Sequence, residues 1–278
     1  MEYLPCSWVP DKKWEEIRNI CRRRVSLGRK ITRTKNEVHA LLARNGIELN
    51  HSDIFGVAGL REMRSLDLSD SEKFLLASSI EELVFLTEKA SEVQRTIAFH
   101  AEGNGEAKLL MTIPGIDYYS AMTILGEIGD IARFSSPKKL VSYAGLAPRM
   151  RESGNSSIKG GISKEGSSVL RWILVSAVHS ILRCRKGNGR LKKFYLHLIR
   201  RRKPKQVAVV ATAKKLLRII YAMLTEGEKY REGDDLLAYR KIRRMRSAAT
   251  SVTPKDISKN LERLRGKVDI LGGGYAVK

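Results

Sequence analysis

The segment GLAPRMRESGNSSIKGGISKEGSSVLR, residues 145–171, lies between two apolar helical patterns, and the rest of the chain is interpreted around it. No other part of the sequence combines glycine, serine and positive charge so densely. Glycines allow a backbone to approach a ligand closely, and cationic side chains suit a phosphodiester backbone. We therefore predict a flexible polar loop that contacts nucleic acid through five cationic side chains: Arg149, Arg151, Lys159, Lys164 and Arg171.

The charge of the whole chain supports this prediction. Its 278 residues include 52 Lys and Arg against 30 Asp and Glu, a formal net charge of +22. Such an excess repels itself unless a polyanion neutralises it, so nucleic acid is the first candidate partner. The sequence has no long apolar run and no secretory signal pattern, and Cys6, Cys21 and Cys184 are too scattered for a disulfide framework or a metal site. We predict a cytoplasmic, nucleoid-associated protein without a membrane partner.

Residues 1–100 carry the patterns of two long helices. The first follows Asp11 and ends at Gly46, and the second opens with Ser69 and Glu72 at capping-box spacing after an irregular region that reaches about Asp67. Their narrow apolar stripes favour an antiparallel coiled-coil arm. The arm's many arginines are either the solvated face of a scaffold or dimer contact, or a surface that follows RNA or DNA. The sequence leaves both readings open.

Residues 108–226 predict a compact helical domain that begins after a linker-like break from His100 to Lys108. Pro114 and Gly115 separate two short helices in a manner typical of helix-hairpin-helix modules, whose backbone N–H groups bind phosphate. A purely structural turn fits these residues equally well. We take Gly115 as a candidate phosphate contact and expect an all-α fold.

The strongest basic stretch of the chain lies in residues 183–205, which contain no acid. It supplies three further candidate contacts to DNA or phosphate, namely Arg190, Lys192 and Lys193. Beyond Glu226 the chain becomes polar, and we predict a poorly ordered basic tail over residues 227–278.

Catalytic chemistry is not evident from the residues alone. The sequence lacks zinc-protease, nucleotide-loop and paired-cysteine motifs, and its second half has no cluster of carboxylates for two magnesium ions. Judged by residue type and neighbours alone, Ser153, between Glu152 and Gly154, is predicted to be an ordinary turn residue.

Four motifs in order change this interpretation: TIPGI (residues 112–116), ILGEIGD (124–130), FSSPKKLVSYAGLAPR (134–149) and ESGNSSIKGGISKEGSSVLRW (152–172). Together, over about residues 109–226, they resemble the C-terminal transposase domain of bridge-RNA-guided insertion-sequence transposases of the 110/116/902 type. Residues 8–47 resemble the helical segment that joins the RuvC-like and serine-bearing domains of that family.

The resemblance implies that Ser153 is a nucleophile that attacks a DNA phosphate and forms a phosphoserine link. The cations of residues 145–171 would then stabilise the charge that develops on phosphorus. Ser156 and Ser157 compete with Ser153 on chemistry alone, whereas we assign Ser163 to capping the helix that follows.

The resemblance also implies a RuvC-like half whose Asp-Glu-Asp-Asp set binds magnesium, and none of those acids can be assigned here. We therefore expect a truncated or split transposase that binds no cofactor itself, with Mg²⁺ associated only with the missing half. The implied partners are DNA at element ends and target, guide RNA, and a second copy or a full-length transposase. The alternatives are an inactive DNA- or RNA-binding remnant or regulator, and a structural nucleoid-type protein.

Overall fold

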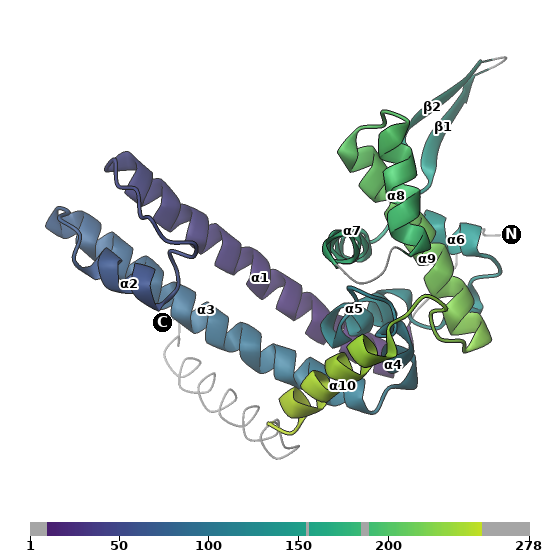
Figure 1. Ribbon diagram of the computed structural model, residues 1–278, viewed down its shortest axis with the longest axis horizontal. Coiled ribbons are helices and arrows are strands. Elements are labelled where there is room, and N and C mark those ends of the chain that lie inside the picture. Colours follow the sequence, from purple (N-terminus) through teal and green to yellow (C-terminus); the bar gives the residue numbers. More distant parts are fainter. Residues whose placement is uncertain (1–9, 154–155, 185–188, 252–278) are drawn as a thin grey trace, which may run out of the picture. The chain divides into compact units, whose positions relative to one another are not determined.

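The computed structural model describes residues 10–153, 156–184 and 189–251 (Figure 1), and within 149–160 it describes the backbone but not the side chains. The chain forms two compact units: a smaller unit of residues 23–93, and a larger unit of residues 1–22 with 94–278. The boundary falls inside two long helices, α1 (Lys12–Arg44) and α3 (Asp70–Glu102), so each helix contributes to both units. The predicted all-α class is confirmed, since helices dominate the described residues.

The smaller unit packs α1 against α3 in opposite directions. Leu27, near the middle of α1, packs with Leu86 and Ala90 of α3. Val38, further along α1, joins the same core as Leu76, which lies earlier in α3. This reversed order of contacts makes the two helices antiparallel. The predicted irregular region before Asp67 instead contains a helix, α2 (Val57–Arg64), because Met63 has an apolar core to enter.

The predicted capping box at the start of α3 is confirmed. The Ser69 N–H donates to Glu72 Oε2 at 3.4 Å, and the Glu72 N–H donates to Ser69 Oγ at 3.4 Å. These reciprocal bonds satisfy two backbone donors that the first turn of the helix leaves unpaired.

The larger unit is built around α9, which packs against α4, α6, α7 and α8. Its elements in chain order are α4 (Gly105–Leu110), α5 (Tyr118–Ile128), the 3-10 helix η1 (Ile131–Arg133), α6 (Pro137–Tyr143), β1 (Pro148–Ser153), β2 (Ser156–Ile162), α7 (Ser168–Arg183), α8 (Arg190–Arg200), α9 (Lys205–Glu226) and α10 (Asp235–Ala249). Asp117 and Ser136 cap α5 and α6, each through a side-chain oxygen that accepts a backbone N–H. The predicted linker-like break is short, because α3 continues to Glu102 and α4 follows at once.

Three predictions for the larger unit are wrong in part. The segment 145–171 is not a loop throughout, since β1 and β2 pair as an antiparallel hairpin. The cap of α7 is Ser167, whose Oγ accepts the Leu170 N–H at 3.0 Å, and not Ser163, whose own N–H donates to Ala147 O at 2.9 Å.

The third correction concerns the predicted tail. Residues 235–249 form α10, which is ordered because Ala238, Met245 and Ala249 enter the core of the larger unit. Within the described residues, none of the helices combines the length and the apolar character needed to cross a membrane.

Candidate nucleic-acid interface

The β-hairpin carries Ser153 next to its tip. The register pairs Ser153 with Ser156 as the last pair before residues 154–155, which lie outside the described residues. Met150 pairs with Lys159 and Arg151 with Ile158, and the register shifts between Pro148 and Met150, at Arg149. The structure therefore places the backbones of four predicted site residues, Arg149, Arg151, Ser153 and Lys159, on one hairpin, while their side chains lie outside what it describes.

The root of the hairpin is held by contacts that need glycine. Gly145 has φ of +65°, in the left-handed region, and its carbonyl accepts the Lys164 N–H at 3.2 Å. A Cβ on Gly166 would lie 1.8 Å from the Tyr143 carbonyl oxygen, so only glycine allows the two chain segments to approach this closely.

Arg171 closes the same root. Its Nη1 donates to the carbonyl oxygens of Ala144 at 3.1 Å and Gly166 at 2.8 Å. This predicted phosphate contact thus binds the protein's own backbone with one of its nitrogens. Lys164, the other predicted contact here, is exposed and has φ of +59°.

A buried carboxylate that the sequence analysis missed lies below this root. Glu127 on α5 is 1% exposed, and its two oxygens receive Arg22 Nε at 2.7 Å and Arg22 Nη2 at 3.0 Å. The hydrogen bond that Arg22 donates to Glu127 raises the pKa of the arginine. Ser167 Oγ donates to Glu127 Oε2 at 2.7 Å while it caps α7. One acid therefore connects α1, α5 and the strand-to-helix connection that follows β2. The sequence signal that could have identified Glu127 is its position as a charged residue within the otherwise apolar segment ILGEIG.

The turn at Gly115 packs tightly on α7. Gly115 has φ of +83°, and a Cβ there would lie 2.7 Å from the backbone nitrogen of Ile181. The glycine is therefore required by close helix packing, whatever it binds.

The same turn is bonded to α10 through Lys241. Burial lowers the pKa of Lys241 to about 8, and its Nζ donates to the carbonyl of Ile113 at 2.8 Å and that of Ile116 at 2.8 Å.

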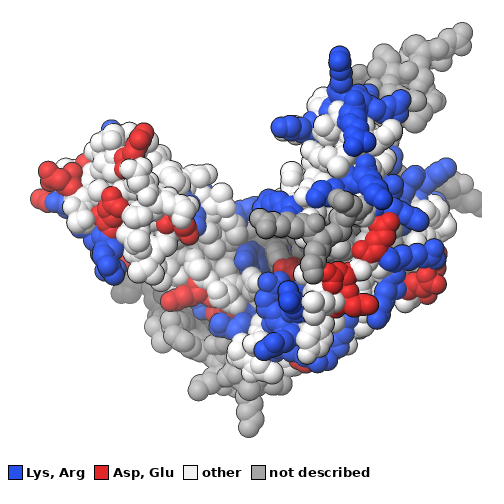
Figure 2. Space-filling model, in the orientation of Figure 1, with Lys and Arg blue, Asp and Glu red and all other residues white. Residues whose placement is uncertain are grey.

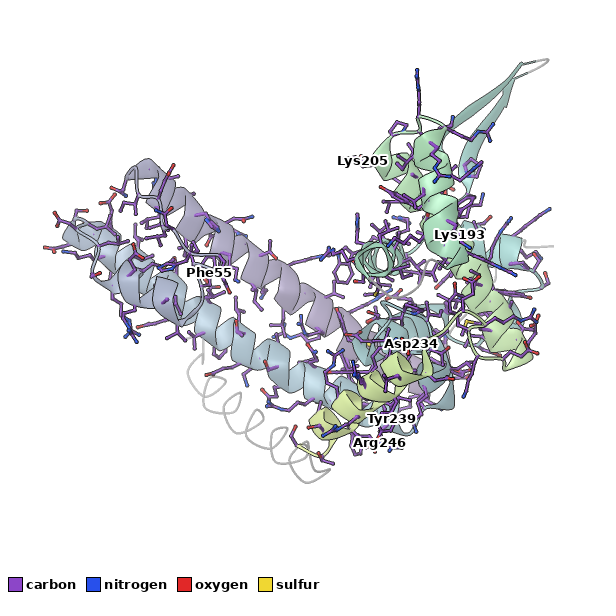
Figure 3. All side chains as sticks on the ribbon, viewed as in Figure 1. Phe55, Lys193, Lys205, Asp234, Tyr239 and Arg246 are labelled. Atoms are coloured by element: carbon purple, nitrogen blue, oxygen red, sulfur yellow. The ribbon has the colours of Figure 1, made fainter. Side chains whose placement is uncertain are left out.

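The basic stretch around α8 remains on the surface. Figure 2 shows Lys and Arg gathered over α8 and the start of α9, where Figure 3 marks Lys193 and Lys205. Lys193 is exposed, whereas Lys192 is half-buried. Arg190 pairs with Glu232, through its backbone N–H at 2.5 Å and its Nε at 3.4 Å. The three predicted contacts on α8 thus differ: Lys193 is exposed, Lys192 is half-buried, and Arg190 is exposed but paired with Glu232.

Among the described residues, no three His, Cys, Asp or Glu side chains gather in a way that could hold a metal ion. The most deeply buried carboxylate described, Glu127, is occupied by Arg22 and Ser167. These residues do not fit a magnesium site.

Comparison with known proteins shows that the part of the chain containing the β-hairpin is similar to a known domain. Residues 107–196 match the family model described as Transposase IS116/IS110/IS902 family. The chain is 31% identical over 169 residues to the transposase for insertion sequence element IS1111A of Coxiella burnetii, covering 61% of this chain and 46% of that protein. It is 27% identical over 237 residues to a probable family 20 transposase of Pseudomonas aeruginosa, covering 84% of this chain and 69% of that protein.

A third relative has a different name. The pilin gene-inverting protein of Moraxella bovis is 34% identical over 149 residues, covering 52% of this chain and 45% of that protein. The chain thus spans about half to two thirds of the length of these relatives. Residues 107–196, which include the β-hairpin and its root, are therefore similar to the transposase domain of the IS116/IS110/IS902 family.

Proposed function

We propose that this chain takes part in DNA transposition or recombination, with Ser153 as the nucleophile on a DNA phosphate. The match of residues 107–196 to the transposase family carries the proposal, because that stretch contains the whole hairpin. Relatives named as insertion-element transposases and as a gene-inverting protein support rearrangement of DNA as the outcome.

The step itself is a transesterification. Ser153 Oγ forms a bond to phosphorus as a bridging P–O bond breaks, and the leaving oxygen keeps the electron pair and takes up a proton. The hydroxyl proton of serine passes to a base. The phosphoserine link conserves the energy of the broken bond, so that a DNA hydroxyl can reverse the reaction on a new strand. Arg149, Arg151 and Lys159 on the hairpin, with Lys164 at its root, are the proposed cations for the developing charge.

The root of the hairpin supports this role, because a nucleophile must be held close to its productive position. Arg171, Gly166 and Gly145 join the two strands' ends to α6 and α7, and Glu127 joins that region to α1. The strand that ends at Ser153 therefore starts from a fixed base.

The proposed partners are DNA at element ends and target, a guide RNA, and further copies or a longer transposase. Magnesium enters as an ion held by a RuvC-like domain of such a longer relative, since the described residues offer no site for it. Recombination requires paired cuts, which favours a dimer or tetramer.

A covalent-capture assay tests the proposal. The chain is incubated with element-end DNA, guide RNA and Mg²⁺, with and without a full-length relative, and DNA-linked peptides are mapped after denaturation. We expect an adduct on Ser153 that Ser153→Ala removes while the affinity for DNA stays nearly unchanged. Ser156→Ala and Ser157→Ala are the matched controls and should retain the adduct.

Two results would contradict this proposal. An adduct that moves to Ser156 or Ser157, or survives Ser153→Ala, would assign the nucleophile elsewhere. Salt-sensitive binding without any adduct in either condition would favour the noncatalytic alternative, a DNA- or RNA-binding regulator.

A further inference from the structure

The helix that the sequence analysis assigned to a tail forms one wall of a groove in the larger unit. The groove has a volume of about 570 Å³. Gly115 and Ser120 line it from the turn and α5, Ser180 and Cys184 from α7 and its C-cap, and Arg240 and Arg244 from α10. Figure 3 locates α10 by Asp234 at its start and by Tyr239 and Arg246 further along.

Lys241 holds this wall in place. Its ammonium donates to three carbonyl oxygens, those of Met111, Ile113 and Ile116, at the end of α4 and in the turn that follows. An ammonium has three N–H donors, so this side chain is fully used by the protein. Lys241 is therefore a structural residue, and the two arginines that flank it are the groups open to a ligand.

Arg240 and Arg244 lie one helical turn apart and are both exposed. Residues at this spacing have Cβ atoms roughly 5–6 Å apart on one helix face. Within the ranges the structure describes, neither arginine forms an ion pair, whereas Arg246 on the same helix pairs with Glu102 at 3.9 Å.

The acid that lines the groove does not cancel this charge. Asp117 is the cap of α5, where its Oδ1 accepts the Ser120 N–H at 2.9 Å. Burial lowers the pKa of Lys241, and the charge of Asp117 offsets part of that shift. The two open arginines thus share the groove with one carboxylate, one oxygen of which already accepts a backbone N–H. The groove therefore keeps an excess of positive charge beside Ser120 and Ser180.

We propose that this groove binds the phosphodiester backbone of a nucleic-acid strand, with Arg240 and Arg244 on the phosphate oxygens. Guanidinium groups match phosphate through paired N–H donors, and serine hydroxyls are common additional donors to phosphate. The inference rests on the nucleic-acid binding of the proposed function but not on the chemistry of Ser153. Duplex DNA, single-stranded DNA and RNA share the recognised group, and the experiment separates them.

The test measures binding of labelled duplex DNA, single-stranded DNA and RNA of one sequence to the full chain over a range of salt concentrations. Arg240→Gln and Arg244→Gln are compared singly and together with Arg243→Gln, which removes the same charge from the same helix but outside the groove lining. Each groove substitution should reduce the slope of log K against log salt by about 0.9 for duplex DNA or about 0.7 for a single strand. Arg243→Gln should leave the slope unchanged, and circular dichroism should show α10 intact in all variants.

A local readout accompanies the slopes. In a Cys6→Ser background, a maleimide reports on Cys184 in the groove, because Cys21 is buried and its pKa is raised to about 12. Saturating oligonucleotide should slow alkylation of Cys184, and Arg240→Gln/Arg244→Gln should abolish that protection. The nucleic acid that gives both effects is the ligand of the groove.

The inference is overturned if Arg243→Gln lowers the slope as much as the groove substitutions do. It is also overturned if Cys184 reacts equally fast with and without saturating nucleic acid of every kind. A Ser153 adduct with unchanged slopes would remove this inference and leave the proposed function intact. Reduced slopes and loss of Cys184 protection without a Ser153 adduct would support the groove and contradict Ser153 as the nucleophile.

Discussion

Replacing Glu127 by Gln tests whether a buried carboxylate holds the root of the β-hairpin that carries Ser153. Gln has the same size, but one of its terminal atoms is an NH₂ donor. Both oxygens of Glu127 accept donors, one from Arg22 Nε at 2.7 Å and the other from Arg22 Nη2 at 3.0 Å and Ser167 Oγ at 2.7 Å. In either orientation the amide therefore turns one donor toward another donor.

The magnitude follows from the burial of the two partners. Removing one member of a fully buried ion pair costs about 3–5 kcal/mol. The side chain of Glu127 is 2% exposed, but that of Arg22 is 50% exposed and can recover water. Losing one charge-assisted hydrogen bond costs about 1.5–3 kcal/mol. We expect Glu127→Gln to lower the free energy of unfolding by about 2–3 kcal/mol, which corresponds to a fall in Tm of roughly 5–10 °C.

Urea unfolding at pH 7, followed by circular dichroism, measures this difference. The control is Glu228→Gln, which breaks the exposed pair with Arg231 in the same unit and should change stability by less than about 0.5 kcal/mol. A loss below about 1 kcal/mol for Glu127→Gln, or a loss equal to that of the control, would refute the argument that this carboxylate is a buried connection.

Two further predictions concern packing and titration. Gly115→Ala should lower the free energy of unfolding by roughly 2–4 kcal/mol, because the new Cβ would lie 2.7 Å from Ile181 N and the residue would keep a left-handed backbone conformation. Gly105→Ala is the control: its Cβ would have no atom within 4 Å, so the same urea titration should show no loss of stability. Burial raises the pKa of Cys21 to about 12 from an ordinary value of 9.0, so its contribution to stability is complete below pH 9 and falls as pH rises above it. The stability of the wild type relative to Cys21→Ala should therefore drop by about 1.3 kcal/mol between pH 8 and pH 10, and a pH-independent difference would count against burial of this thiol.

Features whose causes are local in sequence were predictable. The capping box of Ser69 and Glu72, the cap at Asp117 and the start of α6 at Pro137 all involve partners within three residues. The helical class follows from apolar periodicity in the same way. Such patterns are complete within a short window, so the sequence displays them directly.

The β-hairpin and α10 were not predictable by the same means. Glycine, serine and asparagine are typical of loops, and the two strands pair above a root that Arg171 closes through Ala144, 27 residues away. A basic stretch such as residues 240–246 has the composition of a solvated tail. It becomes a docked helix because Lys241 meets three carbonyls that lie 125–130 residues earlier.

The sequence by itself determined the helical class, the excess of positive charge and the motifs that resemble a transposase domain. Only the tertiary structure decided which cationic side chains bond to the protein's own acids and carbonyls and which remain open to a ligand. Arg22, Arg171 and Lys241 bond to the chain's own carboxylate or carbonyl groups, whereas Arg240 and Arg244 face a groove. Composition counts charges, but only the folded chain brings a distant acid or carbonyl within hydrogen-bond distance of one cation and leaves another in water.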